Sequence, residues 1–162
     1  MSKVIYIKCN PYNYTNVKRP LSSILGIVFH GTANKGDLAV NNGKYFQREK
    51  VGASANYFID GYGNIVKSVP YSRIAHAVET PGMKLKSNLK NSNTISIELC
   101  DIKDKYPTKK QIAAARWLVK YLRRRCPNAK KIVRHYDICG KLCPNTMVDN
   151  DTWQKFLKDL NL

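Results

Sequence analysis

Short apolar runs, bounded by polar residues or glycine, recur along most of the chain. Runs of this kind predict β-strands. We place the strands at residues 4–8, 24–30, 57–60, 65–68, 94–100 and 132–133. The segment Gly61-Tyr62-Gly63-Asn64 joins two of them and has the residues of a hairpin turn.

Helical periodicity is clearest between Thr108, a favourable N-cap, and Pro127, which cannot continue a helix. Apolar residues recur there at intervals of three and four, at Ile112, Ala115, Leu118, Val119 and Leu122. Two further helices are expected at about 37–50 and 151–160. Strands interleaved with helices predict an α/β fold, in which helices flank a central mixed β-sheet.

Length and composition indicate one domain over residues 1–162. The chain is 43% apolar and can bury a substantial core, and no apolar run is long enough to span a membrane. No signal segment follows Met1-Ser2-Lys3, and five cysteines are an odd number for a disulfide framework. We therefore expect a protein made in a reducing cytoplasm, with free thiols.

Candidate chemistry lies where predicted strands end. The segment Arg134-His135-Tyr136-Asp137-Ile138-Cys139-Gly140-Lys141-Leu142-Cys143-Pro144 holds an imidazole, an ammonium and two thiols just after a strand. His30 ends another strand, and His76 is the third histidine. Histidine nitrogen and cysteine thiolate are favoured ligands of zinc, and a catalytic zinc needs three protein ligands and an open position.

A structural role is the alternative for these residues. A histidine near an apolar segment is more often a hydrogen-bonded core residue, and a free cysteine is usually a small buried hydrophobe. His30 and His135 lie too far apart in sequence to form a local motif. From the residues alone, both interpretations stay open, and either Cys139 or Cys143 could supply the thiolate.

Four segments in order carry a resemblance to a known family. They are Ile27-Val28-Phe29-His30-Gly31-Thr32, Ala53-Ser54-Ala55-Asn56-Tyr57-Phe58-Ile59-Asp60-Gly61, Asn91-Ser92-Asn93-Thr94-Ile95-Ser96-Ile97-Glu98, and His135 through Lys141-x-Cys143-Pro144. Together they resemble the zinc-dependent N-acetylmuramoyl-L-alanine amidases. This family includes phage endolysins and bacterial autolysins, and the animal peptidoglycan recognition proteins are its relatives.

The resemblance implies a hydrolase that cleaves the amide bond between N-acetylmuramic acid and L-alanine of peptidoglycan. It implies one Zn²⁺ per chain, bound by His30, His135 and Cys143. Amide hydrolysis also needs a proton acceptor and a group that stabilises the developing oxyanion. In positions that match the family, Glu98 is expected to be the base and Lys141 the oxyanion partner.

Three positions depart from the family's pattern. Asn56 stands where the family usually has histidine, Ser96 where it usually has glycine, and Ala55 where some phage members have a catalytic tyrosine. Because Ala55 removes the tyrosine option, Glu98 is the better candidate for the general base. Asn56 is expected to contact the substrate, Tyr57 to pack in the core or form part of the substrate wall, and His76 to bind the substrate or to support another site residue.

The charge balance predicts a polyanionic partner. The chain has 28 basic and 11 acidic residues, a net charge of +17. Besides peptidoglycan itself, we expect anionic polymers of a wall, such as the phosphate-rich teichoic polymers of Gram-positive bacteria. Nucleic acid is the alternative polyanion, but the chain has no recognised nucleic-acid-binding signature, so specific binding is not expected.

The sequence is compatible with two functions. The first is the catalytic domain of a phage or prophage endolysin, a monomer that reaches the wall through holin pores; the sequence leaves open whether a wall-binding domain belongs to the native protein. The second is a peptidoglycan-binding module on the same fold without hydrolysis. The presence of Cys143 together with His30 and His135 favours the first.

Overall fold

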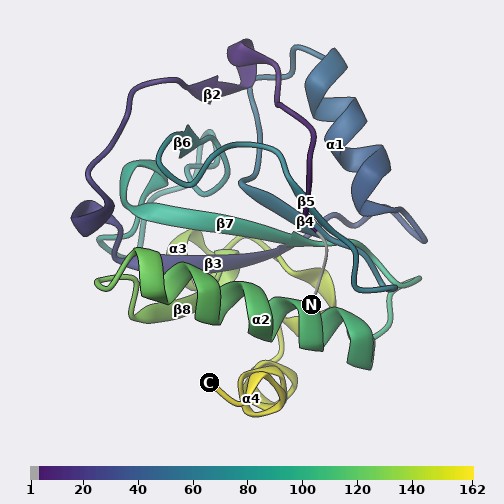
Figure 1. Ribbon diagram of the computed structural model, residues 1–162. Helices are drawn as coiled ribbons and strands as arrows, with labels where there is room; N and C mark the ends of the chain where they lie inside the picture. The colour runs from purple at the N-terminus through teal and green to yellow at the C-terminus, as the bar shows by residue number, and fades with distance from the viewer. Residues whose placement is uncertain (1–3) are drawn as a thin grey trace.

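A computed structural model describes residues 4–162 and contains a six-stranded mixed sheet (Figure 1). Across the sheet the strands are β1 (Val4–Tyr6), β5 (Ile65–Lys67), β4 (Tyr57–Ile59), β7 (Thr94–Leu99), β3 (Gly26–Gly31) and β8 (Lys131–Arg134). The hairpin partners β4 and β5 are antiparallel, and the other neighbouring pairs are parallel. The predicted α/β class with a mixed sheet is therefore confirmed.

Helices cover both faces of this sheet (Figure 1). One face packs against α2 (Lys109–Arg125) and α4 (Asn150–Leu160), and the other against α1 (Ala39–Arg48) and the short α3 (His135–Cys139). The small sheet β2 (Tyr14–Thr15) with β6 (Ile74–Ala75) is antiparallel. Single 3₁₀ turns lie at Pro11–Asn13, Leu21–Ser23, Asn91–Asn93 and Asn145–Met147.

Side-chain alternation along the central strands separates the core from the site. In β3, Ile27 and Phe29 belong to the main core with α2 and α4, and the Phe29 ring lies 5.0 Å from that of Phe156. Val28 packs on the opposite face, against Ile138 of α3. Because successive strand residues point to opposite faces, His30 lies on the same face as Val28.

The structure differs from the sequence expectations mainly at short elements. The helix expected at 37–50 is shorter, because Asp37 accepts hydrogen bonds from the side chain of Asn42 and from the backbone N–H of Asp101. The strand expected at 4–8 ends at Tyr6. The sequence reading missed β2, β6 and α3, since elements of two to five residues show no measurable periodicity.

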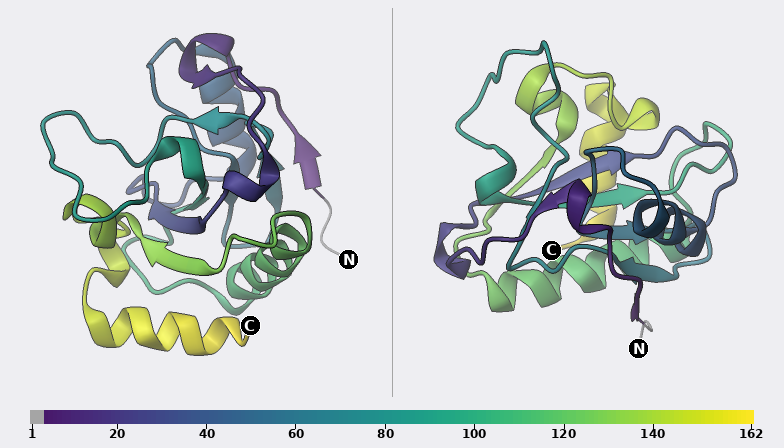
Figure 2. Two further views of the ribbon diagram at one scale, coloured as in Figure 1. Left: turned by 90° about the vertical axis from the view of Figure 1, so that its left-hand side faces the viewer. Right: turned by 90° about the horizontal axis from the view of Figure 1, so that it is seen from above.

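The segment after β6 packs beside α3 (Figure 2). The backbone N–H of Lys86 donates to the carbonyl of Ile138 over 2.7 Å, and Leu89 lies in the same apolar cluster as Ile138. All five cysteines are buried free thiols, as expected. Within residues 4–162, the helices are too short or too polar to cross a membrane.

Candidate metal centre

Strand register brings His30, Glu98 and His135 together. His30 of β3 is the direct partner of Glu98 on β7, so the two side chains point to the same face. On the other side of β3, Phe29 pairs with Arg134 of β8, and His135 follows as the first residue of α3. Three segments distant in sequence thus end at one edge of the sheet.

The turn after α3 returns the chain to this edge. Gly140 ends the helix with φ of +81°, a left-handed conformation that glycine adopts without strain. The backbone N–H of Tyr136 then donates to the carbonyl of Cys143 over 2.9 Å. Cys143 is thereby placed against β3, where its Sγ accepts from the backbone N–H of Gly31 at 3.4 Å.

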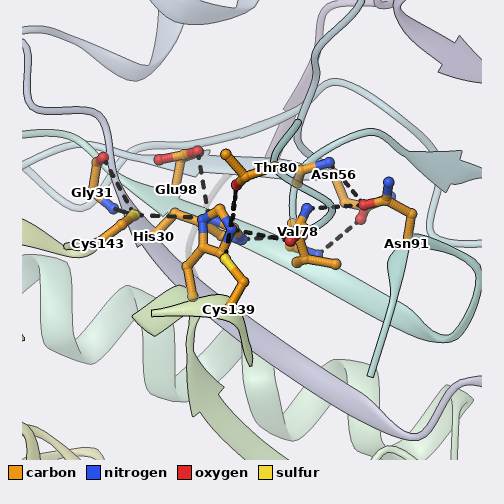
Figure 3. Close-up of polar contacts among 12 residues, drawn as sticks. His30, Gly31, Asn56, Val78, Thr80, Asn91, Glu98, Cys139 and Cys143 are labelled. Carbon is orange, nitrogen blue, oxygen red and sulfur yellow. Dashed lines mark hydrogen bonds and ion pairs between the residues drawn. The ribbon is translucent and has the colours of Figure 1, made fainter. Parts of the chain in front are cut away.

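Three potential ligand atoms converge, and Figure 3 shows two of the residues that supply them, His30 and Cys143, beside Glu98. The Nδ1 atoms of His30 and His135 are 3.1 Å apart, and Cys143 Sγ lies 3.9 Å from Nδ1 of His30. One ligand atom from each residue lies within 4.8 Å of the other two. Two nitrogens bound to one tetrahedral zinc would be about 3.3 Å apart, given Zn–N distances of about 2.0–2.1 Å. The cluster therefore fits a zinc ion.

The outer nitrogens of both rings have partners. His135 Nε2 lies 3.1 Å from the carbonyl of Val78 and 3.1 Å from Thr80 Oγ1. Because the carbonyl only accepts, His135 Nε2 carries the proton and Nδ1 keeps its lone pair. His30 Nε2 lies 3.2 Å from Ser96 Oγ. Such outer contacts are typical of metal-binding histidines, since they fix the ring and its tautomer.

Burial sets the protonation of the cluster. Burial lowers the pKa of His30, and it lowers the pKa of His135 to about 4. The positive charge of Lys141 lowers both pKa values further. Both rings are neutral at pH 7 and can donate lone pairs. Burial also raises the pKa of the Cys143 thiol to about 12, so a bound cation is needed to favour the thiolate.

Glu98 lies beside the cluster. Its Oε1 is 4.0 Å from His30 Nδ1, and its Oε2 is buried with no hydrogen-bond partner among the described residues. Burial raises the pKa of Glu98 to about 7, against the lowering effect of the Lys141 charge, and Asp37 adds a smaller increase. A carboxyl group with this pKa exchanges protons readily near neutral pH.

A cavity of about 300 Å³ opens onto these groups. Its lining includes six of the residues expected to be functional: His30, His76, Glu98, His135, Lys141 and Cys143. His76 is half-buried, and its Nε2 lies 2.9 Å from Thr15 Oγ1. Cys139 lies outside the ligand cluster, with its Sγ 3.8 Å from Thr80 Oγ1. The geometry favours Cys143 over Cys139 as the thiolate.

The structure places two of the residues considered for substrate contact away from the cavity. Tyr57 is 2% exposed and belongs to the core on the α2 face of the sheet, opposite the cavity. Asn56 is fully buried, and its amide donates to the Val69 carbonyl while its Oδ1 accepts from the backbone N–H of Ser96. Neither side chain can reach a ligand in the cavity.

Sequence reasoning missed the residues that hold the histidines. Thr80, the carbonyl of Val78 and the hydroxyl of Ser96 contact the two rings, but nothing in the sequence marks the first two. Ser96 was noticed only as a departure from glycine. The role of Arg134 at the start of α3 was also missed. Asp137, three residues later, accepts from the backbone N–H of Arg134, and an acidic residue in the first turn is a recognisable signal of a helix start.

Comparison with known sequences decides the family. The sequence profile of N-acetylmuramoyl-L-alanine amidases matches residues 20–146. The chain belongs to this family. A probable N-acetylmuramoyl-L-alanine amidase of Bacillus licheniformis is 35% identical over 158 residues, which cover 91% of this chain and 44% of that protein. The amidase CwlL of the same species is 32% identical over 163 residues, 94% of this chain and 44% of the relative.

The chain therefore spans less than half the length of these curated members of the amidase family. Among solved structures, a mutant endolysin from Bacillus subtilis has a TM-score of 0.76 and 22% identity, with 99% of both chains covered. The catalytic domain of XlyA has a TM-score of 0.77 and 23% identity, covering 98% of this chain and 99% of the other. These likenesses support the amidase fold.

Proposed function

We propose that this chain is the catalytic domain of a zinc-dependent peptidoglycan hydrolase of the endolysin type. Its reaction is hydrolysis of the amide bond between N-acetylmuramic acid and L-alanine of the stem peptide. The observation that carries the proposal is the convergence of His30, His135 and Cys143 beside the unpartnered Glu98 carboxyl in an open cavity. The amidase names of the curated relatives support the choice of bond.

The donor set suits a catalytic rather than a structural zinc site. Two neutral imidazoles and one thiol are three protein ligands, and a tetrahedral ion then keeps one position for water or substrate. The ligands line the cavity, so that position is accessible. A zinc ion held by these residues would supply Lewis-acid activation of water and of the scissile carbonyl.

Glu98 is the proposed general base. It would accept a proton from the attacking water and donate that proton to the leaving amine, and its Oε1 is the oxygen near the ligand cluster, 4.0 Å from His30 Nδ1. A pKa of about 7 keeps both protonation states accessible during the reaction. Lys141 contributes a positive charge to the same cavity, where it would stabilise the negative charge that develops on the carbonyl oxygen.

His76 is the proposed substrate-orienting residue. It lines the cavity on the side away from β8, and Thr15 Oγ1 and the carbonyl of Gly52 hold its ring at 2.9 and 3.3 Å. A ring fixed in this way costs little conformational entropy when a ligand binds.

Anionic wall polymers are the proposed second partner. The helix α2 carries seven basic residues and no acidic residue: Lys109, Lys110, Arg116, Lys120, Arg123, Arg124 and Arg125. A surface of one sign attracts a polyanion over a distance of about 10 Å at 0.1 M salt. This binding would depend on the charge of the polymer and would weaken as the salt concentration rises. It requires no contact with the cavity.

The test is product analysis on purified Gram-positive walls. The wild-type protein should release free amino groups without new reducing sugar ends, and Glu98→Gln should lose this activity while it still binds walls. The exposed Glu49→Gln is the matched control and should behave like the wild type, since Glu49 contacts Arg48 at the surface. Wall binding by the wild type without amine release would instead indicate a binding module, and new reducing ends would indicate glycosidic cleavage.

A further inference from the structure

Ser96 contacts the outer nitrogen of a proposed metal ligand. Its side chain lies on the same face of β7 as that of Glu98, and the residue is 2% exposed. Its Oγ is 3.2 Å from Nε2 of His30 (Figure 3 shows His30 within the cluster).

The contact matters because His30 is enclosed. If Nδ1 of His30 binds the metal, the neutral ring carries its proton on Nε2, and that N–H is buried. A buried donor without an acceptor costs about 1–3 kcal/mol. Ser96 Oγ is the hydrogen-bond partner of this nitrogen among the described residues. The hydroxyl can accept from this N–H, and it can donate to Nε2 when the ring proton is on Nδ1, so it has a hydrogen bond to the ring in either tautomer.

In the metal-free cluster the other tautomer of His30 has a partner in His135, and Ser96 accepts from Nε2 once a metal occupies Nδ1. His135 keeps a lone pair on Nδ1, because its Nε2 donates to Val78. His30 could then place its own proton on Nδ1 and donate it to His135 across 3.1 Å. That hydrogen bond would occupy both nitrogens that the metal needs.

Asn56 holds Ser96 in place. Its Oδ1 accepts from the backbone N–H of Ser96 at 2.9 Å, and its own N–H donates to the Ser96 carbonyl at 3.1 Å. The amide of Asn56 also donates to the Val69 carbonyl at 3.2 Å, which fixes its orientation. Ser96 and Asn56 are thus in direct contact, and Ser96 in turn contacts the ring of His30.

We propose that Ser96, fixed by Asn56, is a positioning residue that holds the His30 ring in the orientation required for metal binding and accepts from its Nε2–H when Nδ1 binds the metal. The inference rests on the proposed zinc site. It concerns the affinity and preorganisation of that site, which depend on groups that orient the ligands.

The test compares Ser96→Ala with Ser68→Ala. Both remove one hydroxyl from a buried serine of the same chain, but Ser68 Oγ has no hydrogen-bond partner among the described residues. Zinc dissociation constants are measured by competition with a chelator, after thermal melting of the metal-free proteins shows that they are folded. Loss of an outer contact typically weakens metal binding by about 10–100-fold, so this loss is expected for Ser96→Ala and not for Ser68→Ala.

A second readout separates orientation from packing. The ¹⁵N chemical shifts of His30 report the hydrogen bond at Nε2, and Ser96→Ala should change the Nε2 shift while Ser68→Ala leaves it unchanged. Equal zinc affinity in the wild type and Ser96→Ala overturns the inference, as does weaker binding with unchanged His30 shifts. Absence of zinc binding by the wild type would instead refute the proposed function on which the inference rests.

Discussion

Replacement of Arg134 by alanine should destabilise the segment that delivers two of the proposed ligands. The Arg134 side chain is buried, and its Nη2 donates to Asp137 at 2.6 Å and to Asn150 Oδ1 at 3.0 Å. Its Nη1 donates to the carbonyls of Met147 and Val148 at 3.1 and 2.7 Å. One guanidinium thus connects the start of α3 to the start of α4, on either side of Cys143.

The magnitude follows from what the substitution leaves behind. Asp137 would lose its counter-ion, and the carbonyls would lose a charged donor in a site that water reaches poorly. Removing one partner of a buried ion pair costs about 3–5 kcal/mol. For a domain of this size, 1 kcal/mol corresponds to a shift of about 2–4 °C in Tm, so the expected loss is roughly 6–20 °C.

Urea unfolding of the metal-free protein measures this loss directly. Arg116→Ala is the matched control, because the half-buried Arg116 also donates to two carbonyls, those of Asp159 and Leu160. Arg134→Lys keeps the charge but not the planar fork, and its stability should lie between those of the wild type and Arg134→Ala. A loss below about 1 kcal/mol for Arg134→Ala, or one equal to that of Arg116→Ala, would refute this reasoning.

Four further predictions use other parts of the structure. Glu98→Gln should stay folded and bind zinc but lose about 10²–10⁴ in the rate of amine release, because loss of one acid-base group has this effect. Tyr57→Phe should keep most of that rate, since the ring lies on the opposite face; a large loss would contradict the placement. Thr108→Ala should lower the free energy of unfolding by about 1 kcal/mol in urea titrations, because Thr108 Oγ1 caps α2 by accepting from the Gln111 N–H at 3.1 Å. Wall binding, followed by co-sedimentation, should weaken from low to moderate salt. Six phosphate contacts on B-DNA would give a log–log slope of about −5, and flexible wall polymers should give a smaller one.

The sequence predicted the strands and helices whose hydrophobic pattern extends over many residues. The buried run ending at His30, the strand containing Glu98 and the helix after Thr108 all appear where expected, because burial and capping act over many residues. The residues alone left the metal site and the choice between Cys139 and Cys143 open, and the ligand set came from the resemblance to the amidases. The structure brings together His30, His135 and Cys143 as that resemblance implies.

Register and short elements could not be predicted in the same way. Tyr57 and Asn56 are adjacent, so their side chains point to opposite faces of the sheet. Neither lines the cavity, because Tyr57 packs under α2 and Asn56 is enclosed by backbone groups. The helix α3 depends on hydrogen bonds between Arg134 and Asp137 over a few residues. Thr80 reaches His135 only because the loop folds onto α3, and such tertiary contacts leave no local pattern. Monomeric state and holin release stay predictions.

The most direct test of the metal centre is the zinc content of Cys143→Ser and Cys139→Ser, measured by elemental analysis after dialysis against a zinc buffer. Both cysteines are buried and lie four residues apart, so the pair is matched for chemistry and burial. The wild type and Cys139→Ser should each hold one zinc per chain, and Cys143→Ser should lose it. Retention of zinc by Cys143→Ser together with loss by Cys139→Ser would contradict the ligand set that the structure supports.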